Sequence, residues 1–313
     1  MRFAPAGRSV SIYTSLMTKT GETVTIKAVA ILGAGGMMGQ GMARNAAAAD
    51  IPVNAWNRTG SKLDELAAVE NVATFATARE AVDGADVIVT MLSDADATIA
   101  AMQGPDGGAA GSEGAVWVQM GTLGVEGAER CAELARDRGL GYVDAPVLGT
   151  KKPAEEGQLV VLASSDGTQR ELLEPFFDAV GKRTIWLGAA GEGSRLKVVV
   201  NSWLCSIAEG TAEMLRLAAA LGLESALVLD ALEDGPLEAP YMRMKGEAML
   251  RRDFSPSFKL SLATKDARLA ADAGAAAGAE IPVIEAIAAQ MEAVAAKHPD
   301  EDVAALFLGT RDS

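Results

Sequence analysis

A glycine-rich turn near the start of the chain is the first group of residues whose spacing suggests chemistry. It follows a β-branched run and reads Gly33-Ala34-Gly35-Gly36-Met37-Met38-Gly39. Glycines between a strand and a helix let backbone N–H groups approach a pyrophosphate at the positive end of the helix. Two of the glycines match the first two of the dinucleotide fingerprint, but the third falls one residue late, at Gly39. We expect dinucleotide contacts from Gly33, Gly35, Gly36, Met37 and Met38.

A second feature follows the next β-branched run, where the sequence reads Asn57-Arg58-Thr59. In dinucleotide-binding folds, an acid at the end of the second strand hydrogen-bonds the adenine ribose of NAD, whereas an arginine there accommodates the 2′-phosphate of NADP. No acid stands at these three positions. We therefore expect NADP(H) to bind in preference to NAD(H), with Asn57, Arg58 and Thr59 as contacts.

A third feature is a lysine in an apolar helical stretch, Leu196-Lys197-Val198-Val199-Val200. A cation is unfavourable among apolar neighbours unless it faces a polar cleft or a partner. Lys197 can be a side chain that extends to solvent or forms a salt bridge, or it can give a proton to an alkoxide that forms when a carbonyl is reduced. Asn201 lies one turn further along the same helical face, where it can orient Lys197 or hydrogen-bond a substrate.

The elements that must position these groups alternate between short β-branched runs and helical stretches as far as about Gly188. This alternation indicates right-handed βαβ crossovers and a largely parallel sheet. Thr77 and Glu80 form a predicted capping box, and Gly139 marks a predicted helix end. The predicted strands are 29–32, 53–56, 72–75, 87–92, 116–120, 142–145, 159–163 and 184–187.

Strand signals largely cease after Gly188. The proline-free, apolar-rich stretch 194–221 predicts one long buried helix, and shorter helices are expected at 225–233, 239–251, 260–277 and 281–296. The predicted fold is therefore an α/β Rossmann-type, doubly wound parallel sheet domain followed by an all-α domain. The predicted units are a flexible N-terminal extension (1–24), an NADP-binding domain (25–189) and a helical domain for substrate binding and dimerisation (190–313).

Composition excludes several classes of function. The formal net charge of −14 opposes binding to nucleic acid or to an anionic membrane. The two cysteines, Cys131 and Cys205, are too few for a disulfide framework, which fits a reducing cytoplasm. The only histidine, His298, lies in a polar stretch and is expected to be solvated. A catalytic histidine or a histidine-rich metal site therefore lacks its residues, and we expect no metal.

Several motifs together resemble the β-hydroxyacid dehydrogenases, a family that includes 3-hydroxyisobutyrate dehydrogenase and semialdehyde and glyoxylate reductases. The resemblance extends over nearly the whole chain from about Thr25. Its motifs are Met38-Gly39-Gln40-Gly41-Met42-Ala43-Arg44-Asn45, Met91-Leu92-Ser93, Asp144-Ala145-Pro146-Val147 with Glu156-Gly157-Gln158-Leu159, Gly191-x-Gly193-x-x-x-Lys197-x-x-x-Asn201, and Lys265-Asp266 with Leu269-Ala270.

The resemblance implies a hydride transfer between NADP(H) and a small β-hydroxyacid or semialdehyde, that is, a dehydrogenase or reductase acting on a CH–OH group. It implies that Lys197 is the general acid/base, assisted by Asn201. It also implies that the 91–93 turn lies beside the nicotinamide and that a late helix contacts the cofactor. The corresponding cofactor residues are Met91, Leu92, Ser93, Thr122 and Lys265.

Two departures from the family pattern concern the substrate. Gln119-Met120-Gly121-Thr122 stands where the family usually has Asp-x-Ser-Thr, and Leu148-Gly149-Thr150 stands where it has Ser-Gly-Gly. Two small hydroxyl donors for a substrate carboxylate are thus missing, although Thr122 and Thr150 can substitute for them. The predicted substrate contacts are Thr122, Leu148, Gly149 and Thr150.

Two other functions remain open. An imine reductase has a similar two-domain fold, but that group generally has an acid or a tyrosine in place of the lysine, so Lys197 argues against it. A non-catalytic NADP-binding module of the same fold would lack the lysine. The abundant alanine of the helical part favours helix packing between subunits, and we expect a homodimer or a homotetramer.

Overall fold

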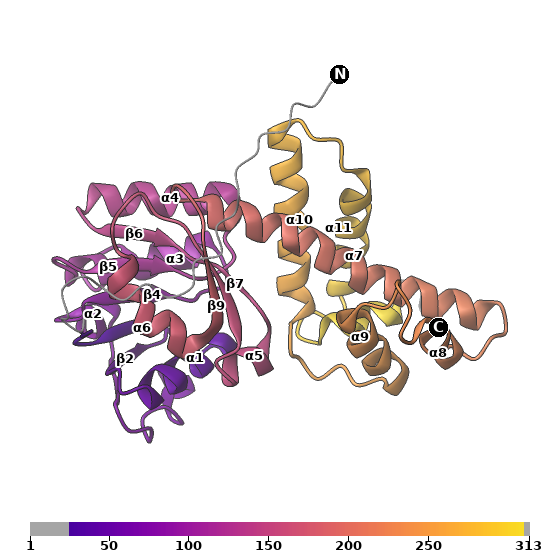
Figure 1. Ribbon diagram of the computed structural model, residues 1–313, viewed down its shortest axis with the longest axis horizontal. Helices are drawn as coiled ribbons and strands as arrows, with labels where there is room; N and C mark the ends of the chain where they lie inside the picture. The colour runs from indigo at the N-terminus through magenta and orange to yellow at the C-terminus, as the bar shows by residue number, and fades with distance from the viewer. Residues whose placement is uncertain (1–24, 310–313) are drawn as a thin grey trace.

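A computed structural model of the chain describes residues 25–309, and the predicted flexible extension at 1–24 lies outside this range. The described residues form a sheet-containing lobe and a helical lobe, which one long helix connects (Figure 1). None of the helices within this range is long and apolar enough to cross a membrane.

The main sheet has six parallel strands in the order β3-β2-β1-β4-β5-β6. Strands β1, β4 and β5 are buried at every residue, as expected when helices cover both faces. This confirms the predicted doubly wound fold. The strands are β1 (Val29–Leu32), β2 (Val53–Trp56), β3 (Val72–Thr74), β4 (Val87–Thr90), β5 (Val116–Gln119) and β6 (Gly141–Asp144).

The helices between these strands begin and end at recognisable residues. The side chain of Thr77 accepts a hydrogen bond from the backbone of Glu80 and the reverse bond is also present, so the predicted capping box is confirmed. Gly139 has φ +67° directly after the C-terminal cap of α4, as a helix end requires. The connecting helices are α1 (Met37–Ala48), α2 (Ala78–Val82), α3 (Ala95–Met102) and α4 (Gly124–Asp137), with short 3₁₀ turns at η1 (Gly60–Leu63) and η2 (Gly108–Ala110).

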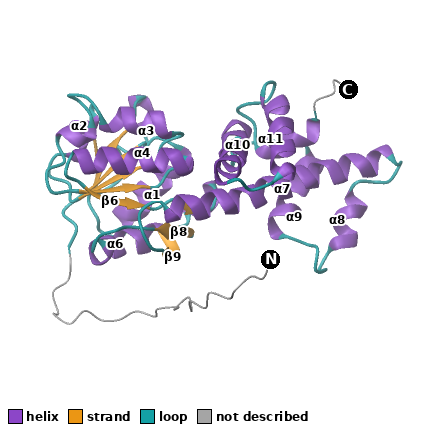
Figure 2. Cartoon of the chain, turned by 90° about the horizontal axis from the view of Figure 1, so that it is seen from above, coloured by secondary structure: helices purple, strands orange, loops and turns teal. Residues whose placement is uncertain are grey.

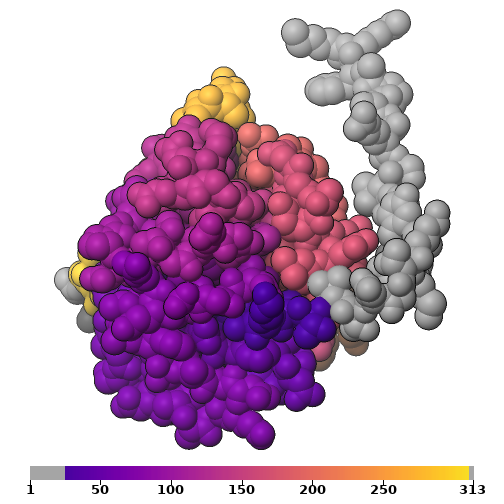
Figure 3. Space-filling view, turned by 90° about the vertical axis from the view of Figure 1, so that its left-hand side faces the viewer, coloured from indigo at the N-terminus to yellow at the C-terminus, as the bar shows by residue number. Residues whose placement is uncertain are grey.

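The last strands of this lobe form a separate sheet, so the prediction that 159–163 and 184–187 continue the main series is wrong. Its order is β7-β8-β9, with β7 antiparallel to β8. A short buried apolar run has the same pattern in either sheet, so sequence could not separate the two. The elements are β7 (Val147–Leu148), α5 (Lys151–Glu155), β8 (Leu159–Ala163), α6 (Arg170–Val180) and β9 (Gly181–Trp186), and the part containing α6 and β9 covers one side of the lobe (Figure 3).

The helical lobe is built on α7 (Glu192–Ala220), which at about 1.5 Å per residue is roughly 43 Å long and runs from the sheet lobe through the helical lobe (Figure 2). The helices lie within two residues of the predicted ranges, whereas the final 3₁₀ segment had no sequence signal. The remaining elements are α8 (Ala226–Leu232), α9 (Pro240–Arg251), α10 (Leu260–Ala277), α11 (Pro282–Ala295) and η3 (Val303–Leu308).

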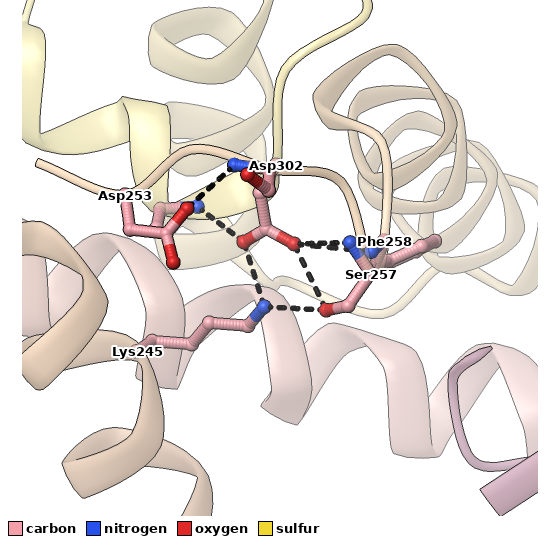
Figure 4. A network of polar contacts seen from close by, with 7 residues as sticks. Lys245, Asp253, Ser257, Phe258 and Asp302 are labelled. Carbon is pink, nitrogen blue, oxygen red and sulfur yellow. Dashed lines mark hydrogen bonds and ion pairs between the residues drawn. The ribbon is translucent and has the colours of Figure 1, made fainter. Parts of the chain in front are cut away.

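A buried ion pair fastens the end of the chain to this lobe (Figure 4). The Lys245 ammonium on α9 lies 2.6 Å from Oδ1 of Asp302 and donates to the hydroxyl of Ser257. The other oxygen of Asp302 accepts from the backbone N–H groups of Ser257 and Phe258. Both charges are buried but fully paired, so we infer that the network stabilises the packing of these segments.

Candidate functional site

The glycine turn joins β1 to α1 and closely approaches the rest of the sheet. Gly33 has φ +99°, and a Cβ there would lie 2.4 Å from the carbonyl oxygen of Met91. A Cβ on Gly39 would lie 2.3 Å from the carbonyl oxygen of Gly33. Gly39, one residue beyond the usual fingerprint position, therefore allows the close helix-to-turn packing that the third glycine provides.

The N-terminus of α1 is open to an anion. Gly36 is its N-cap, no side chain among the described residues caps the helix, and its first turn contains no acid. Uncapped N–H groups and the positive end of the helix dipole together favour a phosphate. The residues present therefore fit a dinucleotide pyrophosphate at Gly33, Gly35, Gly36, Met37 and Met38.

The later residues of the motif that runs from Met38 to Asn45 contact other parts of the protein. A Cβ on Gly41 would lie 2.5 Å from the carbonyl oxygen of Ala154 in α5, and Asn45 donates to that carbonyl at 2.8 Å. Met42 is fully buried in the core. This half of the motif therefore packs α1 against α5.

The turn after β2 lies directly beside the glycine turn. A Cβ on Gly35 would meet Asn57 at 2.8 Å and the Cβ of Lys62 at 2.7 Å. Asn57 donates to the carbonyl of Thr59, whereas Arg58 is exposed. Lys62, in the 3₁₀ turn η1, is a second cation that the sequence reasoning missed. The sequence signal for it was its position only four residues after Arg58.

The turns after β4 and β5 face each other. A Cβ on Gly121 would lie 2.7 Å from the carbonyl oxygen of Leu92, so the two turns are in close contact. Ser93 donates a 2.6 Å hydrogen bond to Asp94, whose other oxygen caps α3 by accepting from the backbone of Ala97. Buried Gln119 closes the second turn by exchanging two hydrogen bonds with the backbone of Gly121. Both polar groups of the Gln119 side chain are thus bonded within this turn.

Lys197 lies in the first turns of α7 and is only 7% exposed. Within residues 25–309 its ammonium forms no hydrogen bond or ion pair, although the charges of Asp266 and Lys265 act on it. Burial lowers the pKa of Lys197, Asp266 opposes that change, and Lys265 adds to it. A buried ammonium with a depressed pKa and no bonded partner is suited to proton transfer.

Asn201 does not bond to Lys197. Its Nδ2 donates a 2.6 Å hydrogen bond to Oδ2 of Asp266 on α10, and its buried Oδ1 has no hydrogen-bond partner among the residues that the structure describes. The neighbouring Lys265 lies 2.8 Å from the other oxygen of Asp266 and donates to the carbonyl of Thr122. The structure therefore joins Thr122, Lys265, Asp266 and Asn201 in one chain of contacts beside Lys197.

The predicted substrate residues 148–150 are less tightly connected to the group around Lys197. Leu148 ends β7, Gly149 has φ +131°, and Thr150 is the N-cap of α5 without a side-chain capping bond. No hydrogen bond between described residues joins Leu148, Gly149 or Thr150 to Lys197.

The glycines before Lys197 fix the start of α7 against the sheet lobe. Gly191 is the N-cap with φ +94°, and a Cβ on Gly193 would lie 2.3 Å from the carbonyl oxygen of Leu162. Asp144, at the end of β6, accepts hydrogen bonds from the backbone and the hydroxyl of Ser194 at 2.7 and 2.8 Å. Burial raises the pKa of Asp144 to about 6 although these bonds oppose the change. Lys197 is thus held one turn from a closely packed, hydrogen-bonded junction between the lobes.

His298 is partly exposed, and its Nδ1 lies 3.1 Å from Glu301. It lies among the residues that follow α11, far in sequence from Lys197. No group of three or more metal-binding side chains occurs in the part of the chain that the structure describes.

Known proteins match both lobes. The model of the NAD-binding domain of 6-phosphogluconate dehydrogenase matches residues 28–188, and that of the NAD-binding region of NADP-dependent 3-hydroxyisobutyrate dehydrogenase matches residues 191–308. The chain is 32% identical over 303 residues to glyoxylate/succinic semialdehyde reductase 2 of Arabidopsis thaliana, covering 95% of this chain and 84% of that protein.

Two further similarities are to a solved structure and to a longer protein. The structure of 3-hydroxyisobutyrate dehydrogenase from Mycobacterium tuberculosis with L-serine superimposes with a TM-score of 0.80 at 29% identity, over 91% of this chain and 99% of that one. The human cytokine-like nuclear factor N-PAC is 31% identical over 291 residues, which is 91% of this chain but 52% of N-PAC.

Proposed function

Since this chain belongs to the β-hydroxyacid dehydrogenase family, which includes 3-hydroxyisobutyrate dehydrogenase, we propose that it is an NADP(H)-dependent oxidoreductase with Lys197 as its general acid/base. Its substrate pair is a small aldehyde that carries a carboxylate and the corresponding hydroxyacid. The observation that supports this proposal most strongly is the buried, unbonded ammonium of Lys197 at the junction of the two lobes.

Reduction of an aldehyde adds a hydride to carbon and a proton to oxygen. The bound nicotinamide supplies the hydride chemistry. Lys197 gives the proton from Nζ to the oxygen and stabilises the negative charge that develops there. In the oxidative direction the neutral amine takes the hydroxyl proton. The unpartnered Oδ1 of Asn201 is an acceptor that can orient the ammonium or the substrate hydroxyl.

The preference for NADP(H) rests on two cations beside the glycine turn. Arg58 is exposed directly after β2, and the Cβ of Lys62 lies next to the turn at Gly35. A guanidinium and an ammonium can share one phosphate, the first by paired hydrogen bonds and the second as a point charge. No carboxylate occupies positions 57–59 to bind a free ribose diol.

The substrate assignment draws on the name of a relative and on three side chains of the predicted substrate site. The Arabidopsis relative is named for glyoxylate and succinic semialdehyde, both of which are aldehydes with a carboxylate. In this chain the hydroxyl groups of Thr122 and Thr150 are the proposed donors to that carboxylate. Leu148 replaces a polar residue and favours a longer or less polar substrate than glyoxylate.

The test is NADPH consumption with glyoxylate, succinic semialdehyde, matched uncharged aldehydes and a cyclic imine. We expect turnover with a carboxylated aldehyde and a lower kcat/KM for the uncharged aldehyde of equal length. Turnover confined to uncharged carbonyls would overturn the substrate class. Turnover confined to the imine would instead identify an imine reductase.

The similarity to N-PAC favours a second candidate, a cofactor-binding module without turnover. The same assay separates the two when it is combined with calorimetric titration of NADPH. Saturable NADPH binding with no consumption across the aldehyde panel, in the forward and reverse directions, would support the module and refute the enzyme.

A further inference from the structure

Asp144 is a buried acidic residue that joins three parts of the molecule. It ends β6 of the main sheet, and its backbone exchanges hydrogen bonds of 3.0 and 2.8 Å with the backbone of Ser164, which follows β8 of the second sheet. Its side chain accepts from the backbone and the hydroxyl of Ser194 in α7 at 2.7 and 2.8 Å. Asp144 and Ser164 are fully buried, and Ser194 is 2% exposed. Both sheets and the helical lobe are therefore bonded together at this residue.

The sheet lobe caps the N-terminus of α7. The N-cap residue of this helix forms no side-chain capping bond. Two N–H groups of the first turn bond to the sheet lobe instead, because Gly193 donates to the hydroxyl of Ser164 at 2.9 Å and Ser194 donates to the carboxylate of Asp144. A carboxylate at this position satisfies a free N–H group and interacts favourably with the helix dipole. The helix that carries Lys197 is thus capped by side chains of the opposite lobe.

Two series of polar contacts lead from the turn at residues 119–122 to α7. The first runs from Gln119, which bonds within the turn and to Asp144, and ends at Ser194. The second begins at the other end of the turn, passes through the adjacent lysine and aspartate of α10, and ends at Asn201. Ser194 lies three residues before Lys197, and Asn201 lies four residues after it. The two series therefore attach α7 on both sides of Lys197.

We propose that Asp144 is a positioning residue for proton transfer by Lys197, because its carboxylate fixes the first turn of α7 relative to the turn at residues 119–122. This inference rests on the proposed function, since it assigns Asp144 to that reaction. Asp144 acts through Ser194 and not on the reacting atoms. A displacement of about 1 Å at a reacting group can reduce a rate by about 100-fold. A bond that fixes the helix one turn from Lys197 is therefore large enough in effect to control kcat.

The charge of Asp144 lowers the stability of the fold, which favours a role in the reaction. Burial raises its pKa to about 6, so the free energy of unfolding falls as pH rises from the ordinary pKa to that of the folded protein. Among residues 25–309, no lysine, arginine or histidine forms an ion pair with it. A neutral asparagine could cap α7 without a buried charge. The carboxylate differs from an asparagine in holding Ser194 more strongly, since charge-assisted hydrogen bonds are about twice as strong as neutral ones.

The other groups that face Asp144 stay neutral near its pKa or bond elsewhere. Burial raises the pKa of Cys131 on α4 to about 12 and raises that of Tyr142 on β6 well above its ordinary value. Strands β5 and β8 present only the amide of Gln119 and the hydroxyl of Ser164. The charged side chains in the first turns of α7 are Glu192, which accepts from the backbone of Gly188, Arg195, which pairs with Glu129, and Lys197. Protonation of Asp144 is thus the change expected at this junction as pH falls through its pKa.

The first test compares the pH profile of kcat for aldehyde reduction in the unmodified chain and in Asp144→Asn. In the unmodified chain kcat should fall as pH decreases through the pKa of Asp144, because the neutral carboxyl holds Ser194 more weakly. Asp144→Asn should lose this acid limb and reduce kcat about tenfold to a hundredfold, with NADPH affinity and the free energy of unfolding not lowered. The control is Glu80→Gln, which removes a carboxylate at the N-terminus of α2 and should keep both the limb and kcat.

A milder variant makes the same test without changing a buried charge. Ser194→Ala removes one of the two side-chain bonds and should reduce kcat less than Asp144→Asn does. The double variant should lose no more than Asp144→Asn alone, because both changes break the same contact. An unaltered acid limb in an active Asp144→Asn protein, additive losses in the double variant, or a loss of kcat that only follows a loss of stability would overturn the positioning role.

The second test does not depend on turnover. It measures amide hydrogen exchange in the peptide that contains Gly193 and Ser194, corrected for the intrinsic effect of pH on exchange. Exchange should be slower above the pKa of Asp144 than below it, and this difference should vanish in Asp144→Asn. Equal protection above and below that pKa in the unmodified chain would refute the attachment of α7 by Asp144, even in an active enzyme. A chain that shows the difference but reduces no aldehyde would instead refute the proposed function and leave the attachment supported.

Discussion

Asn201 donates a 2.6 Å hydrogen bond to Asp266, so that α10 holds the residue one helical turn beyond Lys197 on α7. The carboxylate of Asp266 therefore has two effects near the reacting group. It fixes the amide of Asn201, and its charge keeps the pKa of Lys197 from falling as far as burial alone would lower it. This relationship makes Asp266 a positioning residue for the proposed proton transfer.

Replacement of Asp266 should move the pH profile of the reaction. Aldehyde reduction needs the protonated amine, which exists below the pKa of Lys197 and is lost above it, so kcat/KM for reduction should fall as pH rises through that pKa. Asp266→Asn removes the stabilising charge and should move this limb to lower pH. Oxidation needs the neutral amine, so its kcat/KM should rise through the same pKa, and this limb should also move to lower pH in the variant. An unmoved limb with unchanged NADPH affinity would contradict the coupling.

Replacement of Lys197 should abolish most turnover. Lys197→Ala should leave NADPH affinity nearly intact and reduce kcat by about 10²–10⁴-fold, since the general acid is lost. Lys182→Ala, which removes an exposed lysine of β9, is the control and should have normal kcat. A Lys197→Ala protein that keeps normal kcat while a deuteride isotope effect shows hydride transfer to be rate-limiting would rule out the role.

Arg58 and Lys62 should share the 2′-phosphate. A hydrogen bond to a charged group contributes about 1.5–3 kcal/mol, so NADPH should bind about tenfold to a hundredfold more tightly than NADH. Arg58→Ala should remove most of this difference, and Lys62→Ala should remove a smaller part. Neither variant should change NADH affinity. Equal dissociation constants for the two cofactors in the unmodified chain would disprove the preference.

Gly39→Ala should disrupt the glycine turn. The new methyl group would lie 2.3 Å from the carbonyl oxygen of Gly33, and backbone must move to admit it. We expect NADPH affinity to fall at least tenfold, measured by fluorescence titration. Gly60→Ala is the control, because a Cβ there meets nothing within 4 Å. Similar affinities in both variants would mean that Gly39 does not shape the site.

The buried ion pair of Lys245 and Asp302 should contribute far more to stability than the exposed ion pair of Lys259 and Asp300. Asp302→Ala leaves a buried ammonium unpaired, which typically costs about 3–5 kcal/mol. Asp300→Ala breaks the exposed pair with Lys259 and should cost much less, because solvent screens the two charges. Urea unfolding measures both. A smaller loss of unfolding free energy for Asp302→Ala than for Asp300→Ala would show that the buried ion pair is dispensable.

The stability supplied by Asp302 should also depend on pH. Burial alone would raise its pKa, but the Lys245 ammonium and the accepted hydrogen bonds outweigh it and lower the pKa below the ordinary value. Because the folded-state pKa is depressed, this stability is fully present above the unfolded pKa and is lost progressively as pH falls through the lower folded-state pKa.

The sequence by itself determined the fold class, because local patterns encode it. Alternating β-branched runs and helical stretches specify a parallel sheet, and the glycine turn must follow its first strand. The same holds for the all-helical lobe, since apolar periodicity places α7 and its neighbours to within two residues. The capping box at Thr77 and Glu80 is equally local, as both partners lie within one turn.

Only the tertiary structure decided which distant groups meet. The bond between Asn201 and Asp266 spans 65 residues, and the contact of Lys62 with the glycine turn depends on how η1 folds back over Gly35. The separation of β8 and β9 into their own sheet was likewise invisible, because burial gives both sheets the same apolar pattern. A sequence records which side chains are available, but the packing of lobes and turns sets their distances, and those distances decide the chemistry.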